Sequence, residues 1–417
     1  MNHQLNERAD CGADHDVTPT CVKQVYNIDH EAKPSRVTFA VYGTEKASFE
    51  SGDLQTYLQR YNAPAADAGA KYTVVKDDDF DPDTSVEAQF ETALDTQTMM
   101  GLAWPAAGIF YHNGGVFGSD RGQTYDRFVT FLQELITNKT VPSVVSFSES
   151  MPEDMMDPAY ARRLCNMMAQ VGTRGVTLLF SSGNNGPNGD TPSGTHNAIF
   201  EPEFPASCPW VTAVGGTTNL ADEKAVTKST VDITSKLFYT ASGGGFSKLF
   251  TAPDYQKSVV DSYTSKHVPE SYSDYNSYNP KGRGIPDISA FSTRFPTVVG
   301  SISFPTGGTS AATPLWAAIV TLLNDYEASK GRPTLGFINP WLYSLTSGLK
   351  DITKGGNSAG SCNALAGCHL SKTLGFDVTE GWDPVTGLGS PNFKKLKKAL
   401  DERADAKVDD VIALLHT

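Results

Sequence analysis

Residues 143–180 decide the fold, and they read SVVSFSESMPEDMMDPAYARRLCNMMAQVGTRGVTLLF. The β-branched run at 143–147 and the apolar run at 176–180 predict two strands. Between them, the segment from about 158 to 170 repeats its apolar residues with a helical period. A strand, a helix and a second strand in this order predict a unit whose two strands run parallel.

The same alternation extends back to Arg36 and forward to about Val214. It predicts further strands at 36–42, 72–75 and 108–111, and helices that cover 54–61, 85 to about 100, and 125–136. Strict alternation implies an α/β fold with a mainly parallel central sheet and helices on both faces. In such sheets the functional groups lie at the carboxyl ends of the strands.

After Val214 the pattern loosens into loops rich in Gly, Ser and Pro. A long apolar helix is predicted from Ser310 to about Tyr326, and one or two helices are predicted to close the chain. We find no linker and no internal repeat that would separate domains. We therefore expect an N-terminal leader at 1–16 and a single domain at 17–417.

The charge balance excludes two classes of partner. The 417 residues carry 34 Lys and Arg against 47 Asp and Glu, a formal charge of −13, which is wrong for a nucleic-acid-binding surface. No apolar run is long enough to span a membrane. The start of the chain lacks the apolar core of a signal peptide. An acidic, sparsely charged chain suits an acidic compartment, because fewer paired carboxylates are lost by protonation.

The cysteines and one sequon fit an exported protein. Short separations favour the disulfides Cys11–Cys21 and Cys362–Cys368, which leaves Cys165 and Cys208 for each other. Buried free thiols are the alternative, since sequence alone does not fix the pairing. The sequon at Asn138 is a candidate glycosylation site.

Ser310 is the candidate nucleophile. It stands in Gly307-Gly308-Thr309-Ser310-Ala311-Ala312-Thr313-Pro314, at the first turn of the apolar helix. Small neighbours allow a substrate backbone to approach, and the helix dipole favours the negative charge that forms when a hydroxyl attacks a carbonyl. A helix N-cap is the alternative role for this Gly-Thr-Ser run.

A nucleophilic serine needs a general base, and the sequence around the histidines gives little support for a histidine in that role. Only His112 has glycines nearby, in His112-Asn113-Gly114-Gly115. Glu91 and Asp95, four residues apart on a predicted helix, place two carboxylates on one face, where they can share a proton. We expect Glu91 to act as general base and Asp95 to orient it. A solvated helix face is the alternative.

These residues resemble the sedolisin family of serine-carboxyl peptidases, which includes tripeptidyl peptidases. The resemblance covers about Val17 to Phe393. Its further motifs are Phe204-Pro205-Ala206-Ser207-Cys208-Pro209-Trp210-Val211, Ser242-Gly243-Gly244-Gly245-Phe246-Ser247, Gly282-Arg283-Gly284-Ile285-Pro286-Asp287 and Gly381-Trp382-Asp383-Pro384-Val385-Thr386-Gly387. It implies a subtilisin-like fold and acid-acting hydrolysis of peptide bonds through an acyl-enzyme on Ser310.

The resemblance also implies one structural calcium ion in a region at about 350–390. Its ligands would be the carboxylates and backbone carbonyls of Asp351, Ile352, Thr379, Gly381 and Asp383. Family members carry a prosegment, so this chain is expected to correspond to the mature enzyme. We expect a monomer that acts on peptides or unfolded proteins, either secreted or in a lysosome-like or vacuole-like acidic compartment.

One position departs from the family pattern. The family has an Asp where Asn184 stands in Ser181-Ser182-Gly183-Asn184-Asn185-Gly186. That Asp must be protonated to donate a hydrogen bond to the oxyanion, whereas an amide donates at every pH. We expect Asn184 to form the oxyanion hole and to extend activity to higher pH.

The resemblance places substrate backbone along Ser146, Phe147, Ser148 and Glu149. Trp104 and Phe147 are expected either to line a side-chain pocket or to pack in the core. A tripeptidyl aminopeptidase is favoured over an endopeptidase of the same family. A catalytically silent peptide-binding relative and a subtilisin that uses His112 remain as rivals.

Overall fold

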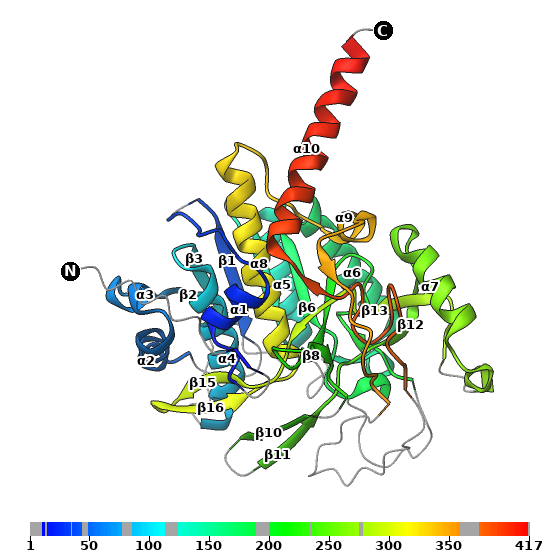
Figure 1. The fold of residues 1–417 in the computed structure, drawn as a ribbon, viewed down its shortest axis with the longest axis horizontal. Helices are drawn as coiled ribbons and strands as arrows, with labels where there is room; N and C mark the ends of the chain where they lie inside the picture. The colour runs from blue at the N-terminus through cyan, green and yellow to red at the C-terminus, as the bar shows by residue number, and fades with distance from the viewer. Residues whose placement is uncertain are drawn as a thin grey trace.

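An eight-stranded sheet lies at the centre of the computed structural model (Figure 1). The structure describes residues 11–12, 15–34, 36–43, 49–76, 86–112, 124–188, 200–227, 229–233, 236–274, 278–358 and 375–415. The strands follow the order β14-β8-β6-β4-β1-β3-β2, with β9 beside β8. Their bounds are β1 Thr38–Gly43, β2 Tyr72–Lys76, β3 Ala107–His112, β4 Val144–Phe147, β6 Thr177–Ser181, β8 Thr212–Thr218, β9 Lys224–Ala225 and β14 Ile288–Phe291.

All neighbours in this order pair in parallel, and only the short β9 runs antiparallel to β8. One face packs on α1 Pro19–Val25, α2 Ser51–Tyr61, α4 Val86–Ala103 and α8 Thr309–Ser329. The other face packs on α5 Thr124–Thr137 and α6 Pro158–Thr173. The prediction of a mainly parallel sheet covered on both faces is confirmed.

The described strands β4 and β6 are buried along their whole length, which explains why their apolar runs are unbroken. In contrast, β8 carries Gly215 and Gly216 where its neighbours approach closely. A Cβ atom at Gly215 would lie 2.7 Å from Pro286 Cγ, and one at Gly216 would lie 2.4 Å from Ser292 Oγ. Glycine is required here by close packing, so this central strand lacks the β-branched pattern of the others.

The expectation of mainly loops after Val214 is wrong. The described residues there include α7 Asp254–Lys266 and antiparallel pairs of strands. The pairs are β10 Ser229–Ile233 with β11 Lys236–Thr240, β12 Gly245–Thr251 with β13 Gly282–Ile285, β15 Phe295–Val299 with β16 Ile302–Thr306, and β17 Leu349–Lys350 with β18 Ser390–Pro391. The smaller elements are α3 Ala63–Asp67, β5 Met151–Pro152, β7 Glu203–Phe204 and α9 Asn339–Ser344. A single closing helix, α10 Phe393–Leu415, points away from the body in Figure 1.

Two disulfides join described segments. Cys11 is bonded to Cys21, and Cys165 in α6 is bonded to Cys208. Both pairings were predicted, whereas Cys362 and Cys368 lie outside the described residues. Asn138 is exposed just after α5, as a glycosylation site requires.

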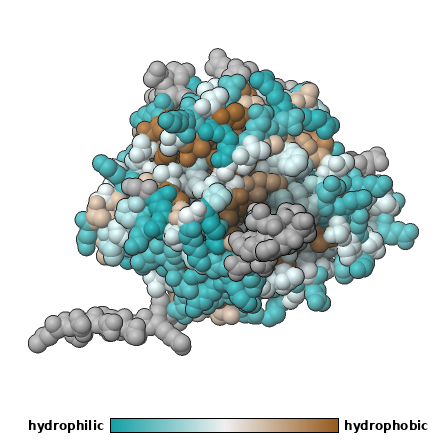
Figure 2. All heavy atoms as spheres, turned by 90° about the horizontal axis from the view of Figure 1, so that it is seen from above, coloured by the Kyte–Doolittle hydropathy of each residue, from teal (hydrophilic) through white to brown (hydrophobic). Residues whose placement is uncertain are grey.

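The surface is mostly polar on the face that Figure 2 presents, with hydrophobic atoms gathered near its centre. None of the helices in the described part of the chain combines the length and the apolar character needed to cross a membrane.

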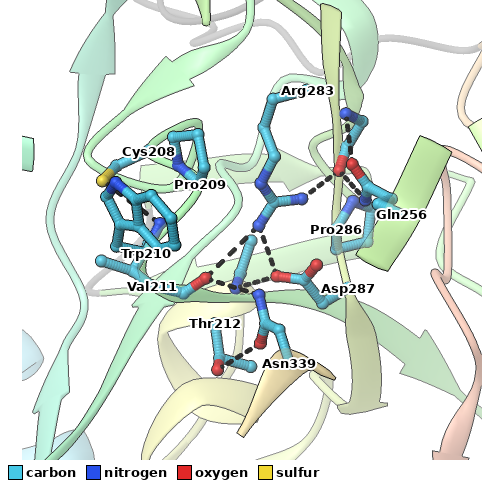
Figure 3. Close-up of polar contacts among 12 residues, drawn as sticks. Cys208, Pro209, Trp210, Val211, Thr212, Gln256, Arg283, Pro286, Asp287 and Asn339 are labelled. Atoms are coloured by element: carbon cyan, nitrogen blue, oxygen red, sulfur yellow. Dashed lines mark hydrogen bonds and ion pairs between the residues drawn. The ribbon is translucent and has the colours of Figure 1, made fainter. Parts of the chain in front are cut away.

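A buried ion pair fastens β13 to the central sheet (Figure 3). Arg283, fully buried, donates to Asp287 Oδ2 at 2.5 Å and to the Val211 carbonyl at 3.4 Å. The same Asp287 oxygen accepts from the Ala213 backbone N–H at 2.7 Å. The family-like motif at 282–287 is therefore part of the scaffold behind β8 and β14.

Candidate active site

Ser310 lies in the first turn of α8, and Gly307 and Gly308 directly precede the helix. Gly308 has φ +112°, a left-handed value that glycine adopts without strain. The Ser310 side chain is nearly buried, at 5% exposure, and its Oγ lies 3.5 Å from the carbonyl oxygen of Ser148. The hydroxyl thus faces the carboxyl end of β4, the edge at which parallel sheets carry their functional groups.

The two predicted carboxylates lie on α4 and line a small pocket at this edge. Glu91, Asp95 and Thr92 form one wall of it, and Ser148 and Glu149 form another. The end of β1, residues 41–43, completes the lining. The solvated-face alternative does not hold for Asp95, which is only 2% exposed, and Glu91 is half-buried.

The surroundings of Asp95 favour its protonated form. Burial raises the pKa of Asp95 well above its ordinary value, and the nearby charges of Glu91 and Glu149 raise it further. The hydrogen bond from Ser148 acts in the opposite direction and does not outweigh burial. A protonated Asp95 beside Glu91 is the arrangement in which two carboxyl groups share a proton.

Ser148 connects the carboxylate helix to the nucleophile. Its hydroxyl donates to Asp95 Oδ1 at 2.8 Å and lies 3.4 Å from the carbonyl oxygen of Ser310. Its own carbonyl accepts from the Ser181 hydroxyl at 2.9 Å, which joins the ends of β4 and β6. Sequence reasoning placed Ser148 against substrate but missed this contact with Asp95. The available signal was its position directly after a strand.

Asn184 follows β6 and is held by its side-chain oxygen. Asn184 Oδ1 accepts from the Thr309 backbone N–H at 2.8 Å, from the Thr309 hydroxyl at 3.2 Å and from the Thr240 hydroxyl at 3.1 Å. These donors fix the orientation of the amide, because Nδ2 cannot accept a hydrogen bond. Nδ2 is left as a donor beside the N-terminus of α8, the geometry expected of an oxyanion-hole residue.

His112 does not lie next to Ser310. It ends β3, and β1 lies between β3 and β4, so about 10 Å separates the two strands. No histidine in the described ranges lies within hydrogen-bond distance of Ser310 Oγ. The arrangement disfavours a histidine base.

Three of the residues predicted to contact substrate, Ser146, Phe147 and Trp104, do not line this pocket. Phe147 packs in the core, with its ring 4.7 Å from that of Tyr42 and 4.8 Å from that of Phe180. Ser146 is fully buried within β4. Trp104 follows the far end of α4, nine residues or about 14 Å of helix beyond Asp95, and packs on the core there. Of the predicted set, the described pocket is lined by Ser148 and Glu149.

The predicted calcium ligands lie together. Asp351 Oδ2 accepts from the Gly381 backbone N–H at 2.7 Å, and Asp383 Oδ2 accepts from that of Thr379 at 3.1 Å. Burial raises the pKa of Asp383 to about 7 and raises that of Asp351. In addition, the Thr379 hydroxyl is buried without a hydrogen-bond partner in the described structure. The buried carboxylate of Asp383 and the exposed carboxylate of Asp351, with the adjoining backbone carbonyls, form an oxygen-rich donor set that suits a hard cation.

Comparisons with known proteins show what the chain is similar to. The sequence profile of the subtilase family matches residues 138–335. Tripeptidyl-peptidase sed4 of Aspergillus fumigatus is 35% identical over 92% of this chain, and tripeptidyl-peptidase SED2 of Arthroderma otae is 32% identical over 92%. The chain spans 66% and 65% of the lengths of these two relatives.

A solved structure of Pseudomonas sedolisin, a serine-carboxyl proteinase, has the same fold. It superposes with a TM-score of 0.68 at 22% identity, covering 92% of this chain and 98% of that one. The chain therefore carries a subtilase-family domain at residues 138–335 and, as its motifs predict, is similar over most of its length to the serine-carboxyl peptidases of the sedolisin family.

Proposed function

We propose that this chain is an acid-acting serine-carboxyl peptidase. The observation that carries the proposal is the bridge at Ser148, which joins the buried Asp95 on one side to Ser310 on the other. These contacts bring the Ser310 hydroxyl and the carboxyl groups on α4 to one edge of the sheet, which supports the proposed roles of a nucleophile and a proton-sharing pair. The names of the fungal relatives support the same activity.

In the proposed reaction, Ser310 Oγ attacks the carbonyl carbon of the scissile bond. Its proton passes to Glu91, while Asp95 shares a proton with Glu91 and limits the build-up of charge. The carbonyl oxygen becomes an oxyanion, which accepts hydrogen bonds from Asn184 Nδ2 and the Ser310 backbone N–H. The dipole of α8 favours the same negative charge.

Collapse of the tetrahedral intermediate breaks the C–N bond. Glu91 returns its proton to the leaving amine, and the acyl group stays on Ser310 as an ester. A water molecule then attacks the ester and gives its proton to Glu91. Breakdown of the second intermediate returns a proton to Ser310 Oγ and releases a carboxylic acid.

The proposed activity is tripeptidyl: it removes tripeptides from free N-termini. This rests on the printed names of the relatives, which are tripeptidyl-peptidases. Mass spectrometry of one long peptide after digestion tests it. A ladder that steps by three residues supports an exopeptidase, and internal fragments support an endopeptidase.

Calcium, processing and location are further parts of the proposal. Asp351 and Asp383, with backbone carbonyls of Ile352, Thr379 and Gly381, would hold one Ca²⁺, which would neutralise the two carboxylates and fix the loop. Their close approach and raised pKa values support this. We also propose a prosegment before maturation, a monomeric mature enzyme, and an extracellular or acidic compartment.

Replacing Glu91 tests the carboxylate mechanism. We expect Glu91→Gln to lower kcat by about 10²–10⁴-fold at acidic pH, because the amide cannot take the proton of Ser310. Ser310→Ala should abolish turnover, and His112→Ala should leave the folded enzyme active. Full activity in Glu91→Gln, or its loss in a folded His112→Ala, would overturn the mechanism. Failure of an acylating probe to label Ser310 would favour a silent binding protein.

A further inference from the structure

Residues 240–244 run beside the loop that carries Asn184 and bond to its backbone. The Ala241 N–H donates to the Asn184 carbonyl at 2.9 Å. The Ser182 hydroxyl donates to the Gly243 carbonyl at 2.8 Å, although 61 residues separate the two in sequence. These bonds fix the main chain of the loop to a segment that the proposed chemistry does not otherwise use.

The two segments approach each other most closely at Gly243. Its N–H donates to the Gly183 carbonyl at 2.8 Å. A Cβ atom on Gly243 would lie 2.6 Å from the Gly183 carbonyl oxygen and closer still to that of Ser182, so a larger residue would push the loop away. The first glycine of the motif at 242–247 therefore has a local task, which is to let this segment reach the loop.

Thr240 adds a side-chain contact at the start of the same segment. It ends β11, which pairs with β10 in a hairpin outside the central sheet (Figure 1). Thr240 is 5% exposed, and its hydroxyl donates to Asn184 Oδ1 at 3.1 Å. Since 56 residues separate Thr240 from Asn184, the sequence motifs did not single it out.

The other donors to Asn184 Oδ1 belong to Thr309, the residue before the nucleophile. The Thr309 N–H donates to this oxygen at 2.8 Å. The Thr309 hydroxyl is shared, because it lies 3.0 Å from the Gly183 carbonyl oxygen and 3.2 Å from Asn184 Oδ1, and a hydroxyl has one proton to donate. The Thr240 hydroxyl therefore supplies the second full hydrogen bond to Asn184 Oδ1.

We propose that Thr240 is a positioning residue, which holds the Asn184 amide with Nδ2 turned toward the oxyanion. The inference rests on the proposed peptidase function. A rotated amide would set Nδ2 against the Thr309 N–H, one donor against another, and would lose the bond from Thr240. The amide is thus oriented before the substrate arrives, as electrostatic stabilisation of an oxyanion requires.

The same hydroxyl would act in the opposite sense on a carboxyl group at position 184. A donor to a carboxylate favours its charged form, and the charged form cannot donate to an oxyanion. Other carboxyl groups around the site are those of Glu91, Asp95, Glu149 and Glu203. Each pair of variants compared below keeps all four, so a difference within a pair reports the Thr240 hydroxyl.

The test introduces Thr240→Val into the wild-type enzyme and into Asn184→Asp, and measures kcat and KM against pH with a peptide that the wild-type enzyme cleaves. In the wild-type background we expect kcat to fall about three- to tenfold at every pH with KM little changed, because only the transition state uses the oriented donor. In Asn184→Asp we expect the pKa of the introduced carboxyl group to rise, so that the alkaline limb of the profile moves to higher pH.

Two further substitutions serve as controls. Thr240→Ser keeps the hydroxyl and should restore the parent profile in both backgrounds. Thr173→Val removes an exposed hydroxyl that bonds within α6, to the Gln170 carbonyl, and should leave both profiles unchanged.

The outcomes separate the two proposals. A folded wild-type enzyme that cleaves no peptide would contradict the peptidase function. An active enzyme in which Thr240→Val keeps the wild-type kcat, or lowers activity in both backgrounds without moving the alkaline limb of Asn184→Asp, would overturn the role of Thr240 alone.

Two fallbacks keep the test decisive. Should Thr240→Val not fold, as judged by circular dichroism, Thr240→Ala takes its place with the same expectations. Should Asn184→Asp be inactive at every pH, the loss of kcat at constant KM in Thr240→Val and its recovery in Thr240→Ser decide the role, and a change in KM alone would contradict it.

Discussion

The hydroxyl of Ser148 donates a hydrogen bond to Asp95 Oδ1 at 2.8 Å, although 53 residues separate the two in sequence. One residue at the end of β4 thereby contacts both the carboxylate helix α4 and the nucleophile helix α8. The two helices also pack directly against each other across the same face of the sheet. The packing of α4 on α8, and of both helices on the sheet, thus sets the relative position of the carboxylates and Ser310.

Removing the Ser148 hydroxyl should change how the carboxyl pair titrates. In Ser148→Ala we expect kcat to fall by about tenfold, because Asp95 loses the bond that favours its charged form. The pKa of Asp95 should rise further, and the acidic limb of the rate profile should move to higher pH. Ser148→Thr, which keeps a hydroxyl, should restore the profile measured as kcat/KM against pH. A profile unchanged in Ser148→Ala would contradict the positioning role.

Exchanging the oxyanion amide for a carboxyl group should narrow the pH range. Asn184→Asp can keep the acceptor for the Thr309 backbone N–H, so the loop should retain its shape. Its carboxyl donates only when protonated, and activity should fall by roughly tenfold for each pH unit above the carboxyl pKa. The control Asn184→Ala should lose about 10²–10³-fold in kcat at every pH. If Asn184→Asp and the wild-type enzyme share one profile, the amide is not the oxyanion donor.

The raised pKa values of buried carboxyl groups predict greater stability in acid. Burial raises the pKa of Asp95 and of Glu153 above their values in the unfolded chain. The folded state then binds more protons than the unfolded state, so the free energy of unfolding falls as pH rises above about 4. Denaturant unfolding at fixed, saturating calcium should give a higher midpoint at pH 4 than at pH 7.

The pH dependence of the free energy of unfolding should come from Asp95 and Glu153. Each pH unit between the folded and unfolded pKa values of Asp95 should remove about 1.4 kcal/mol, and Asp95→Asn should reduce this dependence. Glu153→Gln should reduce it as well, because the carboxyl group of Glu153 is also buried and its pKa is also raised. Equal midpoints for the wild-type protein at pH 4 and 7 would show that the buried groups do not govern acid stability.

Removal of calcium should lower the thermal stability. A ligand at 100 times its dissociation constant stabilises the folded state by about 2.7 kcal/mol, so a chelator should reduce Tm and added Ca²⁺ should restore it. Asp351→Asn should abolish the response while it keeps an acceptor for the Gly381 backbone N–H. Asp222→Asn should respond as the wild-type protein does. A Tm indifferent to chelator would contradict the proposed site.

The sheet and its covering helices could be predicted because their apolar residues follow one period. The buried runs of β4 and β6 and the apolar stripe of α5 are local signals. In α7, by contrast, only Gln256, Val260 and Tyr263 are buried, too few for a clear stripe. The strand β8 was obscured by glycines that close packing requires.

The site residues likewise fall into those that the sequence predicts and those that it does not. Ser310, Glu91 and Asp95 lie in short motifs whose chemistry can be inferred from adjacent residues. The link from Ser148 to Asp95 and the contact of Thr240 with Asn184 join segments distant in sequence. The core position of Phe147 was one of two open alternatives, and it follows from its aromatic neighbours Tyr42 and Phe180.

The disulfide between Cys165 and Cys208 encloses β6, Gly183, Asn184 and Glu203 in one covalent ring. A single peptide bond cut inside this ring leaves both ends attached to the molecule through the sulfur bridge. A peptidase is exposed to its own activity and to that of other copies, and nicks in surface loops are the usual first damage. The loop that carries Asn184 would therefore stay in place after one internal cut, and under the proposed peptidase function the ring would give a measure of resistance to autolysis.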